Sequence, residues 1–409
     1  MVLLGLTTVT LSWPHALLRD VITEYTAFGE ETYLYISVFV FGGLLLIGIW
    51  NFFSPISSRN FTDIRRPFGE GCLRASQFVH TQLFIVLLIV FFVYLAYVPP
   101  FQTGLYAILF DPENSGLARE NSLKLLEFPL LQYAYLITYS VIAPLAFLFA
   151  VNLFLTGRKV TAVRLIVETA IVCIFLLLTG ARAGLAYLAL CLLLLLMVRR
   201  NLKFRWIAMM LAFGAFLYLP AILSMLREGD TSDGSSLVYI GLILDRIFLL
   251  PTIISAWFLE YANSHGFGGW SAVVDGIGSL YNSVALEYGD RYDTIRDSNI
   301  TAPTAYFVQN LYIFYWAGLI PSWLGLILMD LPLIYIKNLL PSMRGPFYAM
   351  GMFYALYFLQ AGYGVVWLTH GYLIFLLLTV AIYHLVKCKP FSDAIRLDRI
   401  KLNLKDDTQ

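Results

Sequence analysis

Two arginines stand in apolar surroundings where a guanidinium group could hold a phosphate. Arg182 lies in the run Leu178-Thr-Gly-Ala-Arg-Ala-Gly184, and Arg246 lies in Asp245-Arg-Ile-Phe-Leu-Leu-Pro251. A guanidinium binds phosphate oxygens through two parallel hydrogen bonds, and two arginines neutralise a pyrophosphate better than one. The alternatives are that Arg182 reaches a lipid headgroup by snorkelling and that Arg246 pairs with an acid elsewhere.

A histidine between glycines and aromatic residues is a candidate general base. His265 stands in Glu260-Tyr-Ala-Asn-Ser-His265-Gly-Phe-Gly-Gly-Trp270. An imidazole titrates near neutral pH and can take a proton from an attacking hydroxyl group. The neighbouring aromatic faces suit stacking on a sugar ring, although they equally suit the membrane interface. Glu260 or a later aspartate could equally act as the base. A purely structural role for His265 also fits the sequence.

The stretch from Glu287 to Thr301 is dense in polar groups and supplies candidates for substrate binding. Arg291, Arg296 and Asn299 could contact glycan or phosphate, and Glu260 and Asp245 join them as substrate-binding candidates. The alternative interpretation of this stretch is a solvated loop with surface ion pairs.

Several common catalytic patterns are missing from the sequence. It contains no phosphate-binding G-x-x-x-x-G-K-[ST] loop, no D-x-D, no G-x-S-x-G and no Cys or His pair at metal spacing. We therefore expect no cofactor and no metal ligands, so positive side chains must stabilise any leaving group. The i, i+4 spacing pairs Arg164 with Glu168, which we interpret as structural, and His80 receives no role.

The composition requires these residues to be positioned by helices in a membrane. Of the 409 residues, 59% are apolar and only 13% are charged, and the mean hydropathy is +0.76. So few charges cannot cover a soluble surface, which excludes a soluble enzyme and a nucleic-acid-binding module. The fold class predicted is all-α and polytopic, with about nine to ten transmembrane helices. Nine apolar runs are the predicted spans, with residues 1–18 as a tenth: 32–54, 81–99, 129–155, 165–180, 183–198, 206–226, 303–330, 346–366 and 370–387.

The basic residues orient these spans. Most of the lysines and arginines fall in segments 55–80, 156–164, 199–205, 336–344 and 387–409, which the positive-inside rule places in the cytoplasm, with the C-terminus. Residues 227–302 then form a long outer loop, interpreted as containing re-entrant or interfacial helices. The predicted organisation is an N-terminal bundle (1–226), this loop (227–302), C-terminal helices (303–387) and a cytoplasmic tail (388–409).

Three short patches resemble the oligosaccharide repeat-unit polymerases of bacterial envelopes, the Wzy-type O-antigen polymerases. The first is Thr179-Gly-Ala-Arg182 at the end of a span. The second runs from Arg246 to Pro251 and on to Tyr261 and His265-Gly-Phe267. The third is Asn299-Ile-Thr-Ala302 followed by Leu311-Tyr312 and Gly318.

The resemblance implies a metal-independent, C-type glycosyltransferase in the bacterial inner membrane, with its active site on the periplasmic side. Its substrates would be glycans on undecaprenyl pyrophosphate, with a chain-length regulator and a flippase as candidate partners and no nucleic acid. Arg182 and Arg246 would stabilise the leaving pyrophosphate, and His265 would act as base. Two alternatives remain open: a ligase that transfers the glycan to lipid A core, and a non-enzymatic transporter or flippase of lipid-linked glycans.

Overall fold

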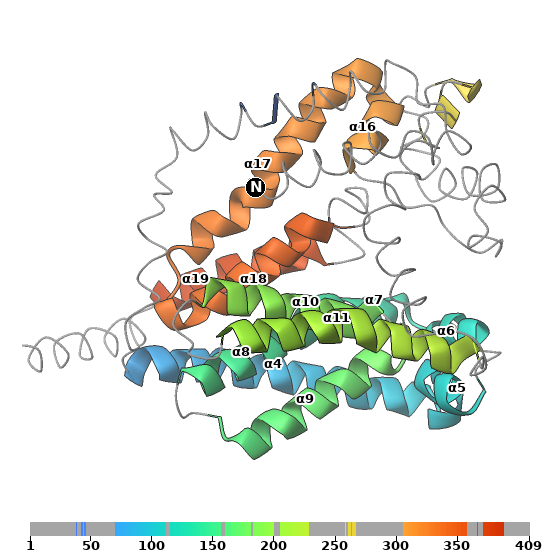
Figure 1. The fold of residues 1–409 in the computed structure, drawn as a ribbon, viewed down its shortest axis with the longest axis vertical. Coiled ribbons are helices and arrows are strands. Elements are labelled where there is room, and N and C mark those ends of the chain that lie inside the picture. The colour runs from blue at the N-terminus through green and yellow to red at the C-terminus, as the bar shows by residue number, and fades with distance from the viewer. Residues whose placement is uncertain are drawn as a thin grey trace, which may run out of the picture. The chain divides into compact units, whose positions relative to one another are not determined.

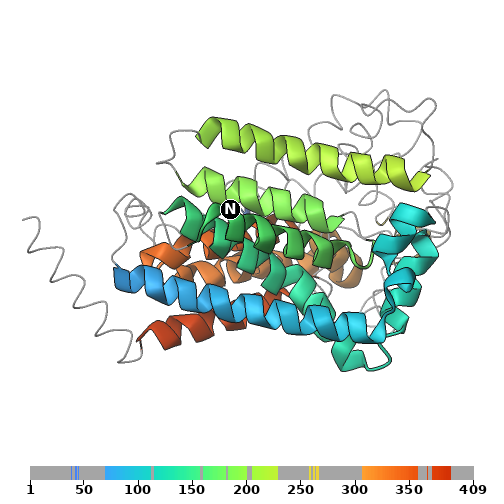
Figure 2. The same ribbon diagram turned by 90° about the horizontal axis from the view of Figure 1, so that it is seen from below.

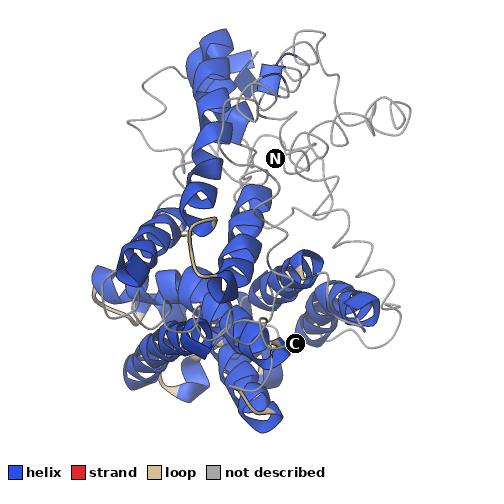
Figure 3. Cartoon of the chain, turned by 90° about the vertical axis from the view of Figure 1, so that its left-hand side faces the viewer, coloured by secondary structure: helices blue, strands red, loops and turns tan. Residues whose placement is uncertain are grey.

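The structure of the protein is a computed structural model, shown in Figure 1. It describes Val38, Gly42, Gly43, Leu45, 70–111, 115–156, 160–180, 183–199, 205–228, Phe258, Tyr261, Ala262, Ser264–Gly266, 306–357, Val366 and 371–387. This part of the chain is helical and contains no strand, and short loops join its helices (Figure 3). Most of the predicted outer loop, most of the predicted span 32–54, residues 1–18 and the tail 388–409 lie outside the described residues.

The chain divides into two compact units. Unit 1 comprises residues 1–55, 244–330 and 354–366, and unit 2 comprises residues 56–243, 331–353 and 367–409.

Unit 2 is a helical bundle built around one buried helix. This helix is α8 (Ala143–Leu155), in which every residue from Ala143 to Leu153 is buried. It packs against α4 (Glu70–Tyr97), α9 (Ala162–Leu177) and α10 (Ala183–Val198), and α10 in turn packs against α11 (Arg205–Glu228). Figure 2 shows α10 between α11 and α8. The unit also contains α19 (Tyr372–Lys387) and the first part of α18 (Pro341–Tyr357).

A short π-helical segment precedes α8. The chain enters through α7 (Pro129–Ile137) and continues through η4 (Thr138–Ile142), where the backbone N–H of Ala143 bonds to the carbonyl of Thr138. Pro144 follows directly and has no N–H to donate, so the normal helical bond to Ser140 cannot form. The wider π turn is a local response to this missing donor.

A hydrogen-bonded polar core joins α4, α8 and α18 near one end of unit 2. The hydroxyls of Ser76 and Ser342 lie 2.6 Å apart, and Ser342 donates to the carbonyl of Cys72 at 2.9 Å. The amide of Asn152 donates to the carbonyl of Ser342 at 2.6 Å. Because Ser76, Asn152 and Ser342 are all buried, these bonds spare the two hydroxyls and the Asn152 amide nitrogen the cost of unpaired burial, whereas Oδ1 of Asn152 has no hydrogen-bond partner among the described residues.

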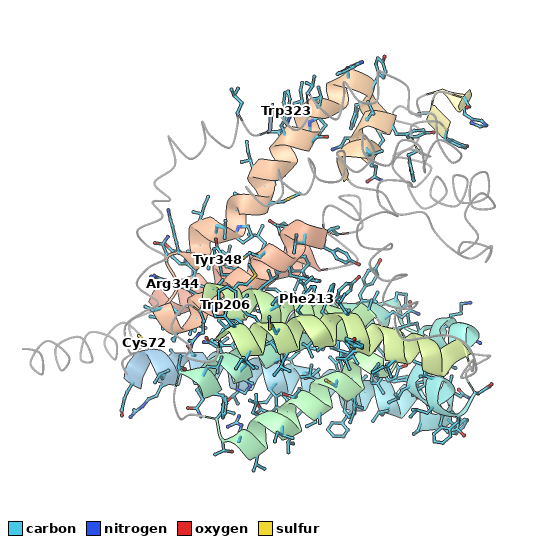
Figure 4. The ribbon with its side chains drawn as sticks, in the orientation of Figure 1. Cys72, Trp206, Phe213, Trp323, Arg344 and Tyr348 are labelled. Atoms are coloured by element: carbon cyan, nitrogen blue, oxygen red, sulfur yellow. The ribbon has the colours of Figure 1, made fainter. Side chains whose placement is uncertain are left out.

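The outward faces of the helices are apolar. On α11 the side chains of Trp206 and Met210 are 70% and 76% exposed, and Phe213 on the same helix is also exposed (Figure 4 labels Trp206 and Phe213). On α9, Val163 and Ile166 are exposed in the same way. Contiguous apolar surface of this kind needs a partner of low polarity, and a lipid bilayer supplies one.

Three described segments are long and apolar enough to cross a membrane. They are Glu70–Tyr97, Pro129–Leu155 and Val308–Ile336, and the shorter apolar helices are Ala183–Val198, Trp206–Leu219 and Tyr372–Val386. The described helices confirm the predicted helical segments near 129–155, 183–198, 206–226 and 370–387. The apolar helices support a helical membrane protein.

Two features of unit 2 were not part of the sequence prediction. The helix α4 begins at Glu70, so the last part of the predicted cytoplasmic segment 55–80 is helical. The connection after α4 is also structured, with η2 (Pro100–Gln102), α5 (Gly104–Phe110) and α6 (Ser115–Lys124). These elements are too short to be recognised from hydropathy.

One predicted span of unit 1 is helical but bent. The run predicted as a single span over 303–330 consists of α16 (Tyr306–Phe314), η8 (Tyr315–Gly318) and α17 (Leu319–Ile336, which continues past the unit boundary). The amide of Asn310 donates to the hydroxyl of Ser322 at 3.1 Å. In a straight helix, residues twelve apart would be about 18 Å apart along the axis. The chain therefore bends sharply at η8, and Val308–Ile336 is not one straight helix.

Candidate functional site

Of the predicted site residues, the structure describes only His265. Arg182, Arg246, Arg291, Arg296, Asn299, Glu260 and Asp245 lie outside the described residues. Parts of all three resemblance patches are nevertheless described, two of them in unit 1 and one in unit 2. No group of three or more His, Cys, Asp or Glu suited to a metal ion occurs among the residues that the structure describes.

His265 stacks on Tyr261 in unit 1. The two ring centroids are 4.2 Å apart, and the planes differ by 18°. The Nδ1 atom of His265 lies 3.3 Å from the carbonyl oxygen of Tyr261. A proton on Nδ1 would donate to this carbonyl and would leave Nε2 as the basic nitrogen. The imidazole itself is exposed, which suits a group that meets an incoming hydroxyl.

The stack on Tyr261 brings two of the resemblance patches together. The ring of Tyr261 is 6.4 Å from the ring of Tyr312, which belongs to the Leu311-Tyr312 pair of α16. Tyr312, Phe258 and Ala262 are all buried. The segment with His265 is therefore attached to α16 through aromatic packing, which the sequence did not predict.

The bend after α16 depends on Tyr315 and Gly318. Tyr315 has a φ of 54°, a left-handed conformation that is unusual for a bulky residue. A Cβ at Gly318 would overlap the backbone of Asn310, so the close approach of η8 to α16 requires glycine. Ser322 stabilises the bend, because its hydroxyl accepts from Asn310 and donates to the carbonyl of Gly318 at 2.6 Å. The third patch thus contributes a broken helix with buried polar groups.

In unit 2, the turn that leads from α9 toward Arg182 packs directly on α5. A Cβ at Gly104 would overlap backbone atoms of Thr179 and Gly180. The N–H of Leu105 donates to the carbonyl of Leu178 at 3.3 Å, and Gly180 has a φ of 72°. Glycine is needed at both positions, at Gly104 for space and at Gly180 for its left-handed backbone. The turn is therefore held by main-chain packing.

Two tyrosines border the other side of this turn. The Tyr135 hydroxyl donates to the carbonyl of Phe175 at 3.2 Å, and its ring packs against Phe175 with centroids 5.0 Å apart. A Cβ at Gly184, in the first turn of α10, would meet the hydroxyl of Tyr139. The turn that precedes Ala181 and the residue Gly184 that follows Arg182 are thus packed against α5, α7 and η4.

A group of three polar residues that joins α4 and α9 was not identified from the sequence. His80 on α4 lies against Glu168 on α9, with Nε2 and Oε2 3.1 Å apart, and Arg164 donates to the other carboxylate oxygen at 2.7 Å. The Arg164–Glu168 pair confirms the contact predicted from the i, i+4 spacing. The spacing gave no indication that His80 would complete the group, and a histidine within an apolar run was the one available signal.

Comparisons with protein-family models, with curated proteins and with solved structures give no match to this chain. The resemblance to the repeat-unit polymerases therefore stays a prediction, and the function has to be argued from the residues and the geometry.

The packing of Gly104 on the turn gives a first testable prediction. The Gly104→Ala protein should lose about 1–3 kcal/mol of unfolding free energy, because the new methyl group meets backbone atoms that cannot move aside. Unfolding of the purified protein in detergent micelles measures this loss. Gly214→Ala on α11 is the matched control, since nothing lies within 4 Å of a Cβ there. Alanine should leave stability unchanged or raise it at Gly214, and equal effects at both glycines would contradict the packing.

Proposed function

We propose that this protein polymerises oligosaccharide repeat units carried on undecaprenyl pyrophosphate, at the periplasmic face of the bacterial inner membrane. The observation that carries the proposal is the fixed turn at Thr179-Gly180, which immediately precedes Ala181 and Arg182 in the sequence. A cation that follows a rigid turn between apolar helices suits an anionic lipid headgroup. The apolar surface of the helices supports the membrane location.

The proposed reaction forms one glycosidic bond and breaks one bond to pyrophosphate. The acceptor's hydroxyl oxygen attacks the anomeric carbon of the donor glycan. The bond from that carbon to the pyrophosphate oxygen breaks, and undecaprenyl pyrophosphate leaves with the electron pair. The hydroxyl proton passes to a base. Because the donor is already activated, this chemistry requires positive charge at the leaving group and a proton acceptor.

Each candidate residue has one role in this proposal. Arg182 and Arg246 stabilise the charge that develops on the pyrophosphate, as their forked guanidinium groups fit its oxygens. His265 takes the proton on Nε2 while Nδ1–H donates to the carbonyl of Tyr261. Arg291, Arg296, Asn299, Glu260 and Asp245 remain candidates for contacts with glycan or phosphate.

The decisive experiment is a reconstituted reaction. Purified protein in lipid bilayers is incubated with a synthetic undecaprenyl-pyrophosphate-linked repeat unit, and the products are separated by size. We expect a ladder of lengthened glycans, the same with and without a metal chelator. Parallel samples with lipid A core as acceptor test the ligase alternative. Products attached only to lipid A core, or no products with any acceptor, would rule out the polymerase.

Replacement of His265 tests the base. His265→Gln should slow polymerisation by about 100-fold, the lower limit for loss of a positioned general base. The rate of ladder formation in the reconstituted reaction is the measurement. His384→Gln is the control, because His384 is also exposed but lies on α19. A His265→Gln rate equal to that of His384→Gln would transfer the role of base to Glu260 or another acid.

A second candidate function is transport of a lipid-linked glycan. The buried His80–Glu168 contact favours it, because ionisable residues inside helical membrane proteins often belong to proton or substrate pathways. The broken helix at Tyr315 is also a common feature of transporters. Proteoliposomes with a fluorescent lipid-linked oligosaccharide distinguish the functions: a transporter moves the label between leaflets without lengthening it.

A further inference from the structure

We propose that His80 and Glu168 form a proton-binding site inside unit 2, in which Nδ1 of His80 takes up the proton and Glu168 stabilises the resulting imidazolium. The inference concerns side chains of α4 and α9. It does not depend on the polymerase function.

The ring of His80 is fully buried. Its side chain is 0% exposed, and it stacks near Phe84 with ring centroids 6.2 Å apart. Nε2 faces the Glu168 carboxylate at ion-pair distance, although the angle falls outside hydrogen-bond geometry. Among the residues that the structure describes, Nδ1 has no hydrogen-bond partner. In a neutral imidazole with the proton on Nε2, Nδ1 is therefore a buried lone pair that can accept a proton.

Glu168 is held as the anion that such a proton needs. Its side chain is 6% exposed, and Arg164 donates to Oε1 at 2.7 Å. With neutral His80, the Arg164–Glu168 pair has no net charge. Uptake of one proton makes the three residues singly positive, with the carboxylate between two cations. An adjacent carboxylate favours the imidazolium, whereas burial and Arg164 oppose it.

Within the described residues, the other elements packed on α4 bring no further charge against His80. The helix α8 has no titratable residue, and α9 adds only Cys173 to Arg164 and Glu168. The segments α7 and η4 contribute tyrosines, of which Tyr135 packs on Tyr94, about 21 Å along α4 from His80. Arg344 of α18 donates to the carbonyl of Leu339. On α4 itself, Glu70 and Arg74 pair with each other at the exposed start of the helix. Glu168 is thus the anion in contact with His80 in the described part of the chain.

The exposed fraction of the side chains falls from Arg164 through Glu168 to His80. The Arg164 side chain is 40% exposed, Glu168 is 6% exposed and His80 is fully buried. Glu168 therefore lies between the surface of α9 and the imidazole. Proton uptake or release at His80 changes the charge between α4 and α9, the two helices that these residues connect.

Nitrogen NMR of the full-length protein in lipid bilayers tests the site. The protein is labelled with ¹⁵N-histidine, and the His80 signals are assigned by comparison with His80→Gln. We expect the Nδ1 signal to shift reversibly from the position of an unprotonated nitrogen to that of a protonated one as the pH is lowered over the range in which the protein stays folded. In Glu168→Gln, the protonated His80 signals should be lost at a pH at which the wild type shows them.

The exposed histidines His265 and His384 are internal controls for the variant, because their signals should not change in Glu168→Gln. The wild-type titration alone remains decisive if Glu168→Gln fails to fold. A His80 ring that stays neutral throughout the pH range would overturn the proposal. So would protonated signals that persist unchanged without the carboxylate.

Discussion

An Arg182→Ala protein should reach the membrane at the wild-type level and yet polymerise far more slowly than the wild type. Loss of one preorganised cation or donor at a developing negative charge typically costs about 10²–10³ in rate. In the proposed reaction the leaving group carries two phosphates, and no metal neutralises them. The effect should therefore reach the upper part of that range. It is measured as the initial rate of ladder formation with the synthetic lipid-linked repeat unit.

A lysine at this position tests the geometry of the charge. Arg182→Lys keeps the positive charge but loses the two parallel donors of the guanidinium, so we expect partial activity. Arg74→Ala is the matched control, since Arg74 is an exposed arginine paired with Glu70 at the start of α4. Its activity should equal that of the wild type. Full-length polymer from Arg182→Ala would remove the arginine from the mechanism.

The helices of unit 2 were predictable because their signals are local. The apolar run from Ala183 to Val198 defines α10 almost to the residue. Thr161 precedes α9 and caps it, with its hydroxyl accepting from the N–H of Arg164 at 3.3 Å. Pro129 fits the first turn of α7, where a missing N–H costs nothing. Each of these features depends on neighbours in the sequence.

The bend at η8 was not predictable from hydropathy. Apolar residues continue through Tyr315 and Trp316, so the run resembles one span although the chain changes direction. Hydropathy records the environment of side chains and carries no information on backbone direction. Gly318 was noted as part of a patch, but its close approach to Asn310 becomes visible only once α16 and η8 are folded together.

The candidate site was predictable in its residue types and not in its contacts. The aromatic residues Tyr261 and Tyr312 belonged to separate patches, and only folding brings their rings to 6.4 Å. The same reason explains why His80 was overlooked. Its partner Glu168 lies far away in the sequence, whereas Arg164 lies one turn from Glu168 and was readily paired with it.

Removal of Arg164 should destabilise the protein more than removal of both members of its ion pair. Arg164→Met leaves the Glu168 carboxylate nearly buried with His80 as its remaining partner. Breaking a fully buried pair costs about 3–5 kcal/mol, and the partial exposure of Arg164 reduces our expectation to about 2–3 kcal/mol. Unfolding of the purified variants in detergent micelles provides the free energies.

The double variant separates electrostatics from packing. Arg164→Met with Glu168→Leu removes both charges and keeps similar volumes, so it should recover most of the lost stability. Arg74→Met is the control, because Arg74 and Glu70 have the same i, i+4 spacing but are exposed, and exposed pairs contribute little. If Arg164→Met lowers the free energy of unfolding no more than Arg74→Met does, Arg164 does not stabilise the Glu168 carboxylate.

If the double variant is less stable than Arg164→Met, the group of Arg164, Glu168 and His80 is a net source of stability. Recovery of stability in the double variant would instead show that the bundle tolerates the buried Glu168 carboxylate only while a cation accompanies it. The Glu168 carboxylate would then not be present for stability, and proton binding would remain as a reason for its presence.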